Sequence, residues 1–129
     1  MDPSAAGYTS RNHRSGSQRG LVAAGAVLAA GSVALAAYAA HVVEPDAQAR
    51  LQSAAWFAFG HGIALAALAP HAARRFGKFA LAGLLLGTLL FSGSLVGAYL
   101  FGAPTALAPF GGGLMILSWL LWAADSVRS

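Results

Sequence analysis

The sequence predicts an all-α integral membrane protein, a single four-helix bundle with both termini in the cytoplasm. Of its 129 residues, 57% are hydrophobic and only 9% are charged, whereas soluble domains carry about 25% charged residues. The mean hydropathy is +0.63, and the apolar residues form four long segments. Each spanning helix needs about 20 apolar residues, so four spans use most of the chain and leave no room for a soluble domain.

The chain begins with residues 1–19, which are rich in Ser, Gly and Arg. This segment holds too few large apolar side chains to offset chain entropy, so we expect a disordered cytoplasmic tail. The membrane domain, residues 20–125, opens with a span at about 21–43. A signal peptide over residues 1–39 is the alternative, but the apolar run is longer than the core of about 7 to 15 residues that such peptides have. We therefore expect this span to be retained.

The second and third spans are expected at residues 51–72 and 79–101. A turn that contains Pro45 and two carboxylates, Glu44 and Asp46, precedes the second span, and Asp46 is a candidate cap for it. The sequence Gly102–Ala103–Pro104 ends the third span with a turn signal.

The fourth span is expected at about 105–124, although it contains Pro109 and the run Gly111–Gly113. The alternative is that Pro109 is the first helical residue, where its missing N–H breaks no hydrogen bond. That alternative leaves a shorter, tilted or partly re-entrant helix.

The orientation follows from the positions of Lys and Arg, which favour the cytoplasmic side. Four spans place both termini on one side, and Arg50 is the single basic residue opposite. The shared side carries seven basic residues: Arg11, Arg14, Arg19, Arg74, Arg75, Lys78 and Arg128. We therefore expect an inner (plasma) membrane protein, or a mitochondrial inner membrane protein with its termini in the matrix. The loop residues Arg74, Arg75 and Lys78 either bind anionic lipid headgroups or serve only as this topology signal.

Aromatic residues are expected in belts at the two membrane surfaces. The outer belt is expected to hold Tyr38, Trp56 and Tyr99, and the inner belt Phe76, Trp119 and Trp122.

Several kinds of chemistry are excluded or disfavoured. The chain has no cysteine, which excludes disulfides, thiolate nucleophiles and cysteine-bound zinc. Asp, Glu, Lys and Arg are absent from mid-depth positions of the spans, so the sequence offers no carboxylate proton relay. Its four histidines, at positions 13, 41, 61 and 71, lie at four depths and do not form a metal ligand set. We expect no catalytic residues, cofactor, metal or nucleic-acid partner, and therefore not an enzyme.

His61 is the one ionisable residue near the bilayer midplane, and it is flanked by Gly60 and Gly62. One interpretation is functional: His61 handles protons, binds haem or a metal ion, or contacts a quinone. Alternatively, it is a neutral histidine that hydrogen-bonds to a neighbouring helix and serves packing, which is the interpretation we favour. His41, at the end of the first span, differs from His61 in depth by roughly 12 Å at 1.5 Å per residue. The two histidines therefore cannot share one metal ion.

The third span carries small residues on one face and hydroxyls on the opposite face. Small residues let helix backbones approach closely, so we expect this helix to have protein on two sides. It is either central in the monomer or contacts a partner, in a homo-oligomer or a larger membrane complex. The small face holds Gly83, Gly87, Ser94 and Gly97, and the opposite face holds Thr88 and Ser92.

Several of these features together resemble the YgdD-like family of small membrane proteins. This family, also called domain of unknown function 423, includes the eukaryotic transmembrane protein 256. The resemblance spans roughly Leu21 to Ala124, and it implies four spans and no established activity. The matching positions are His41, His61, Ser92, Gly93, Ser94, Pro109, Gly111, Gly112 and Trp119. This sequence departs from the family in having Trp56–Gly60 where Gln and Tyr are usual before the second-helix histidine, which puts a polar relay there in doubt.

Two functional hypotheses follow. The first is a non-enzymatic accessory or assembly component that packs through glycine-lined helix faces within the lipid bilayer. The second is a small transporter or redox component in which His61, together with Ser92 or Thr88, lines a polar pathway or cofactor site. The first is favoured because a functional site needs several convergent polar groups.

Overall fold

The computed structural model describes residues 15–42 and 44–128, and within these ranges the chain is helical and contains no strand. The elements are α1 (Gly16–Ala39), α2 (Pro45–Leu68), the short 3-10 helix η2 (Ala69–His71), α3 (Arg75–Phe101) and α4 (Leu107–Val127). All four α-helices are long and apolar enough to cross a membrane. The predicted all-α architecture, with four helices able to span a membrane, is therefore confirmed for the described residues.

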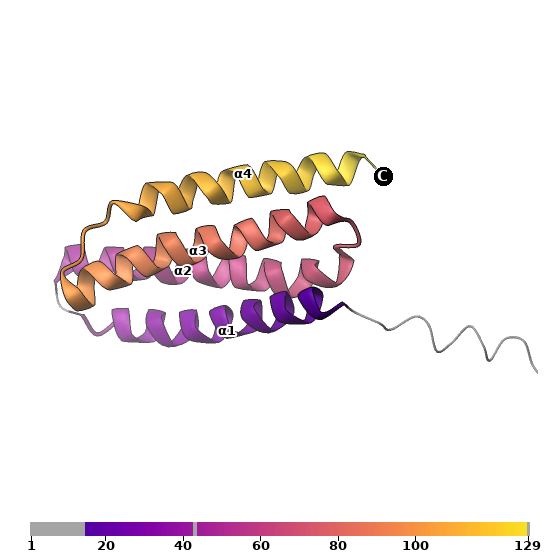
Figure 1. Ribbon diagram of the computed structural model, residues 1–129. Helices are drawn as coiled ribbons and strands as arrows, with labels where there is room; N and C mark the ends of the chain where they lie inside the picture. Colours follow the sequence, from indigo (N-terminus) through magenta and orange to yellow (C-terminus); the bar gives the residue numbers. More distant parts are fainter. Residues whose placement is uncertain (1–14, 43, 129) are drawn as a thin grey trace, which may run out of the picture.

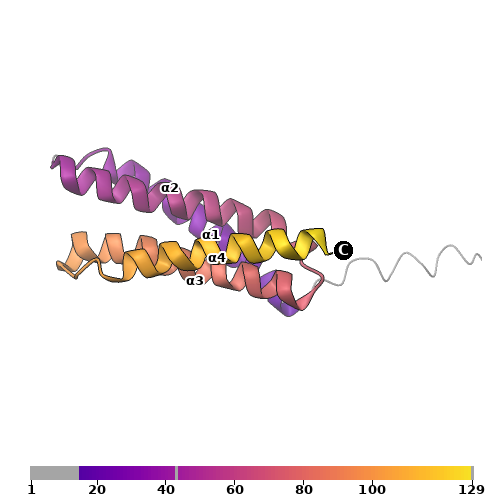
Figure 2. The ribbon, with the colours of Figure 1, turned by 90° about the horizontal axis from the view of Figure 1, so that it is seen from above.

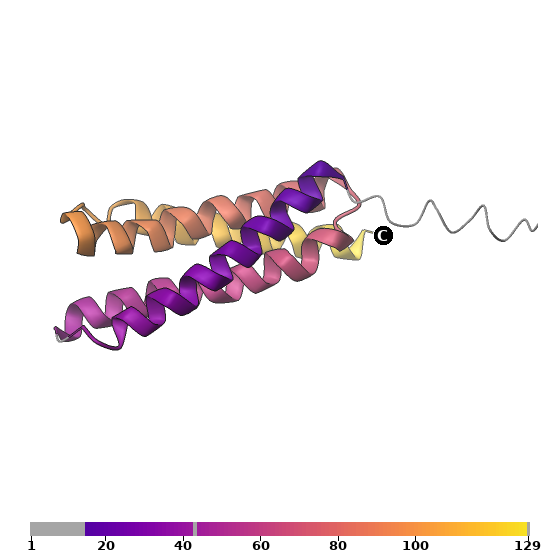
Figure 3. The ribbon, with the colours of Figure 1, turned by 90° about the horizontal axis from the view of Figure 1, so that it is seen from below.

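The helices form two antiparallel hairpins, α1–α2 and α3–α4, which meet along α2 and α3 (Figure 1). Figure 2 shows the two hairpins diverging toward the end where α1 connects to α2 and α3 connects to α4, which we call the hairpin end. The opposite end, with the start of α1, the α2–α3 connection and Val127, is the termini end. Seen from below, α1 crosses α2 obliquely (Figure 3).

α1 begins at Gly16 because its first turn is capped. The Gln18 N–H donates to Ser15 Oγ (3.3 Å) and the Ser15 N–H donates to Gln18 Oε1 (2.8 Å), which together form a capping box. Residues 16–19 are therefore helical, and their assignment to a disordered tail was wrong. The rest of the expected tail, residues 1–14, lies outside the described residues. α1 ends at Ala39, four residues before the expected end.

α2 and α3 also begin earlier than hydropathy indicates. α2 starts at Pro45, a residue favoured at the first helical position, with Asp46 in the first turn where a carboxylate suits the helix dipole. Glu44 therefore takes the cap position that was expected for Asp46. α3 starts at Arg75, four residues before the expected start, and ends at Phe101 as expected. The next residue, Gly102, adopts the left-handed conformation (φ 65°) that ends many helices.

α4 resolves the open question about the fourth span. It begins at Leu107, so Pro109 is its third residue, still within the first turn, where N–H groups have no intrahelical partner. The glycines at 111–113 are helical. The helix therefore begins two residues after the expected start at 105, and the alternative in which Pro109 is the first residue of a shorter helix was wrong.

The main apolar core cluster gathers toward the termini end. Its residues come from all four helices and the α2–α3 connection: Leu21, Leu65, Ala69, Ala72, Leu81, Leu84 and Met115. Toward the hairpin end Leu51 is also buried, but the other buried groups on α2 and α3 there are smaller and include Ala54, Ala58 and Ser92. The two central helices are α2 and α3: both pack against α1 and against each other, and α3 also packs along α4.

Candidate functional site

His61 of α2 is held by hydrogen bonds at both ring nitrogens. Nδ1 lies 2.8 Å from the carbonyl oxygen of Phe57, and the indole N–H of Trp119 in α4 donates to Nε2 across 3.1 Å. An indole nitrogen can only donate, so Nε2 accepts and the proton of the neutral imidazole is on Nδ1. His61 thus links α2 to α4 as a neutral, satisfied histidine.

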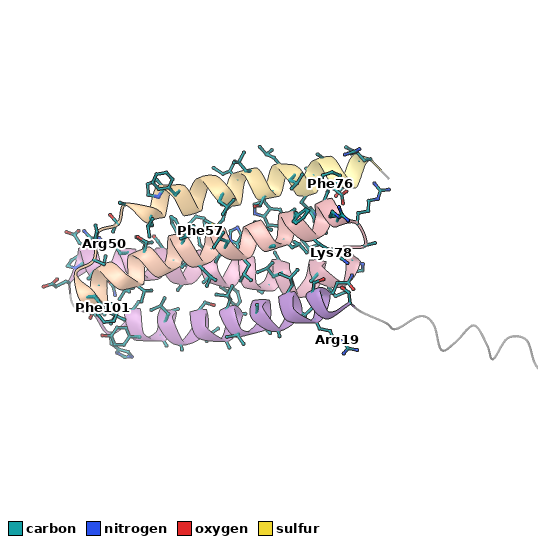
Figure 4. The ribbon with its side chains drawn as sticks, viewed as in Figure 1. Arg19, Arg50, Phe57, Phe76, Lys78 and Phe101 are labelled. Carbon is teal, nitrogen blue, oxygen red and sulfur yellow. The ribbon has the colours of Figure 1, made fainter. Side chains whose placement is uncertain are left out.

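The rings of His61 and Trp119 pack together with those of two phenylalanines. We call these four residues the aromatic cluster: Phe57, His61, Phe91 and Trp119. Phe57 stacks on His61 (centroids 6.1 Å apart, planes at 14°) and its centroid is 4.7 Å from that of Phe91. Phe57 and Trp119 keep 44% and 37% of their surface exposed, so the cluster faces the lipid between α2 and α4. Figure 4 places Phe57 midway along the bundle. Trp119 therefore lies at the level of His61, and its assignment to an interfacial belt was wrong.

Ser92 and Thr88 serve the bundle interior and do not join His61. Ser92 Oγ donates to the carbonyl oxygen of Ala54 (2.8 Å), which ties α3 to α2. Thr88 Oγ1 donates to the carbonyl oxygen of Leu84 (2.7 Å) and lies 3.5 Å from the sulfur of Met115 in α4. The hydrogen bonds of these hydroxyls therefore stay within the packed core, and they do not build a polar pathway with His61.

The glycines of α3 lie against α4 of the same chain. A Cβ on Gly87 would be 2.9 Å from the carbonyl oxygen of Gly111, and a Cβ on Gly83 would overlap Ser118 Oγ. Gly97 has only one neighbour in that range, Ala103 at 3.9 Å. The Gly83 and Gly87 face is therefore an internal helix contact and is not available to a partner. Next to it, the buried Ser94 Oγ has no hydrogen-bond partner among the described residues.

A second close helix contact, between α1 and α2, was missed in the sequence. A Cβ on Gly62 would lie 2.7 Å from the carbonyl oxygen of Gly25 and 2.9 Å from the nitrogen of Ala29. Each helix has a Gly-xxx-Ala pair here, Gly25–Ala29 and Gly62–Ala66. This signal was present, but α1 contains so many alanines that the pattern does not single out one register.

Two glutamines, also missed, fasten the ends of α1 to its neighbours. Gln18 Nε2 donates to the carbonyl oxygen of Ala72 (3.0 Å) at the termini end. Gln48 Nε2 donates to the carbonyl oxygen of Ala39 (3.2 Å) at the hairpin end. Both amides donate to carbonyl groups at or just beyond helix ends, where intrahelical donors are lacking; the Ala39 carbonyl oxygen also accepts from the Val42 N–H (3.2 Å).

His41 lies in the α1–α2 connection at the hairpin end, whereas His61 lies well inside α2, 16 residues beyond its first residue, Pro45. His41 is exposed and lines a hollow together with Glu44, Tyr38 and Tyr99. The hydroxyl oxygens of Tyr38 and Tyr99 are 3.0 Å apart. Within the described residues, no group of three or more His, Cys, Asp or Glu side chains is placed to hold a metal ion.

The basic loop residues surround the start of α3 at the termini end. Arg74 is the N-cap residue of α3, Arg75 is its first residue, and Lys78 is half-buried in the first turn. Cations are unfavourable at a helix N-terminus, so α3 itself gains nothing from them. Asp125 of α4 approaches the same turn, with Oδ2 3.1 Å from the position of a Cβ on Gly77.

Comparisons with known proteins support the resemblance seen in the sequence. A family model described as "Protein of unknown function (DUF423)" matches residues 35–112. The chain is also 35% identical over 106 residues to a "UPF0382 membrane protein" of Haemophilus influenzae, and the match covers 75% of this chain and 85% of the relative. No solved structure matches. The chain is therefore a membrane protein that belongs to the DUF423 family.

Proposed function

We propose that this protein is a non-enzymatic accessory or assembly component of the inner membrane that packs against another membrane chain through the outward face of α1. The observation that carries the proposal is the composition of that face. Its exposed residues, which we call the α1 outer face, are almost all small: Ala23, Ala26, Val27, Ala30, Gly31, Ala34 and Ala37.

Small residues matter here because helices associate in lipid through close backbone approach rather than through the hydrophobic effect. The lipid-facing surface of α4 has the opposite composition, with bulky exposed side chains such as Phe110, Ile116, Leu117 and Leu120. α1 is also the least buried candidate span, at 17% compared with 33% for α2 and α3. A second helix seated on the α1 outer face would bring the burial of α1 closer to that of its neighbours.

The proposed topology has both termini in the cytoplasm, or in the matrix of a mitochondrion. Arg19, Arg74, Arg75, Lys78 and Arg128 all belong to segments at the termini end, and Arg50 alone belongs to the hairpin end. Figure 4 shows Arg19 and Lys78 at one end of the bundle and Arg50 at the other. Such an asymmetry favours retention of the basic end on the cytoplasmic side.

The transporter or redox alternative rests on His61, and the contacts of this residue favour the packing role. Both ring nitrogens are occupied by Phe57 and Trp119, so ligation of haem iron or a metal would require breaking one of these bonds. A visible absorption band in the purified protein that disappears in His61→Ala would revive the alternative.

Site-directed crosslinking tests the proposal in native membranes. The chain has no cysteine, so a single Ala30→Cys variant can be made without altering another residue, and Leu117→Cys on α4 is the matched control. Each cysteine is labelled with a benzophenone maleimide, whose photoactivated ketone inserts into a neighbouring C–H bond. Irradiation is expected to crosslink Ala30→Cys either to a second copy or to one defined membrane protein, and to leave Leu117→Cys uncrosslinked. Equal crosslinking of both variants, or of neither, would contradict the proposal.

A further inference from the structure

We infer that the chain binds the headgroup of an acidic phospholipid in a cavity between α2 and α4 at the hairpin end. This site is independent of assembly through the α1 outer face. The cavity has a volume of about 670 Å³ and lies where the two hairpins diverge, with Leu95 and Ala98 of α3 as part of its lining. Arg50 of α2 and Thr105 of the α3–α4 connection also line it.

Arg50 supplies the charge that selects an anion. Its side chain is exposed, and no carboxylate within the described ranges pairs with it, although Asp46 lies one turn earlier on α2. It is also the one Lys or Arg between positions 19 and 74, on the side that topology rules keep poor in basic residues. A guanidinium group presents a planar fork of donors that matches two phosphate oxygens, so it binds phosphate with geometric specificity.

Thr105 supplies a second polar group next to the cation. Its hydroxyl makes no hydrogen bond to another described residue, so it is free to donate to a ligand oxygen. The lining also includes the apolar side chains of Leu95, Ala98 and Pro109. A site that combines a cation and a hydroxyl with apolar side chains fits an amphiphile better than a free inorganic ion.

The depth of the cavity agrees with this ligand. α3 has 27 residues, about 40 Å at 1.5 Å per residue, so its ends extend beyond a hydrocarbon core of about 30 Å. Leu95 and Ala98 lie within two turns of the last residue of α3, Phe101. Arg50 and Thr105 are therefore expected at the level of the lipid phosphates, and the apolar lining residues are expected to contact the glycerol and upper acyl region.

Native mass spectrometry of the full-length protein in detergent tests the site by counting bound lipids. The probe is dioleoyl phosphatidylglycerol, titrated against wild type, Arg50→Gln, Arg50→Lys and Thr105→Val. Arg75→Gln, which removes a cation at the termini end, is the matched control. We expect one tightly bound phosphatidylglycerol in wild type and in Arg75→Gln. Arg50→Gln should bind it about tenfold more weakly or worse, since a hydrogen bond to a charged group is lost.

The conservative variants keep the test decisive if Arg50→Gln does not fold. Arg50→Lys retains the charge without the fork and should bind with intermediate affinity, and Thr105→Val should weaken binding with the charge intact. The inference would be overturned by wild-type affinity in all three variants, by equal binding of dioleoyl phosphatidylcholine, or by equal potency of oleate. Displacement of the lipid by inorganic phosphate at similar concentration would also overturn it, because the site would then bind free anions.

Discussion

Gly25 of α1 and Gly62 of α2 lie back to back, so close that a Cβ on Gly62 would be 2.7 Å from the carbonyl oxygen of Gly25. The nitrogen of Ala29 and the Cβ of Leu28 would lie 2.9 and 3.1 Å from the same position. The first hairpin is therefore held by direct backbone contact at one point, and the oblique crossing of its helices follows from it.

Gly62→Ala should destabilise the protein because its methyl group has no space. Two of its three nearest neighbours are backbone atoms, so the helices must separate, and overpacking of this kind costs about 1 to 3 kcal/mol. Gly60→Ala, two residues earlier on the same helix, is the control, since nothing lies within 4 Å of its Cβ position. Thermal unfolding in detergent should show a lower Tm for Gly62→Ala alone, and equal Tm values would contradict this contact.

Gly87→Leu should impair folding of the second hairpin, α3–α4, and should not act by removing a contact with a partner. Gly87 packs against Gly111 and Met115 of its own chain, whereas Gly97 has open space beyond Ala103. Gly87→Leu should therefore reduce the yield of folded, monodisperse protein, and Gly97→Leu should leave it unchanged. If Gly87→Leu folded normally but lost a partner, Gly87 would be an intermolecular contact after all.

The bond between Trp119 and His61 should contribute a modest stabilisation. Interhelical hydrogen bonds in membrane proteins average about 0.6 kcal/mol, and Trp119→Phe removes the donor while keeping an aromatic ring. A double-mutant cycle with His61→Ala, read from unfolding in sodium dodecyl sulfate, should give a positive coupling energy. Trp56→Phe, on the exposed surface of α2 with 73% of the tryptophan surface exposed, is expected to show no coupling with His61→Ala.

Gln18→Leu should loosen the start of α1. The Gln18 side chain accepts from the Ser15 N–H and donates to the carbonyl oxygen of Ala72, so its loss leaves both groups without these partners. Amide hydrogen exchange in the first turn of α1 and around Ala72 is expected to accelerate. Gln52→Leu is the comparison, because Gln52 is exposed and its replacement should not change exchange at the termini end.

The number of helices and their approximate positions could be predicted because a spanning segment must satisfy its own backbone and be apolar over about 20 residues. Helix starts could not, since they extend into polar residues such as Ser17, Gln18 and Arg75 that hydropathy counts as loop. The partners of individual residues also escaped prediction. Nothing in the spacing of Trp119 distinguishes an interfacial ring from one that bonds to His61 of another helix.

The small residues show the same limit. The sequence correctly identified α3 as a helix with small residues suited to close packing, but it could not show that α4 of the same chain covers Gly83 and Gly87. Only the arrangement of the four helices identifies α1 as the helix whose small residues remain uncovered.

Copurification tests the central claim, assembly through the α1 outer face, most directly. Tagged full-length protein would be extracted from native membranes in a mild detergent, and copurifying chains identified and counted by mass spectrometry. We expect wild type and Ala82→Leu, a lipid-facing substitution on α3, to retain a membrane chain in fixed ratio, and Ala30→Leu/Ala34→Leu to lose it. Recovery of wild type alone as a monomer, or retention of the same partner by Ala30→Leu/Ala34→Leu, would contradict the claim.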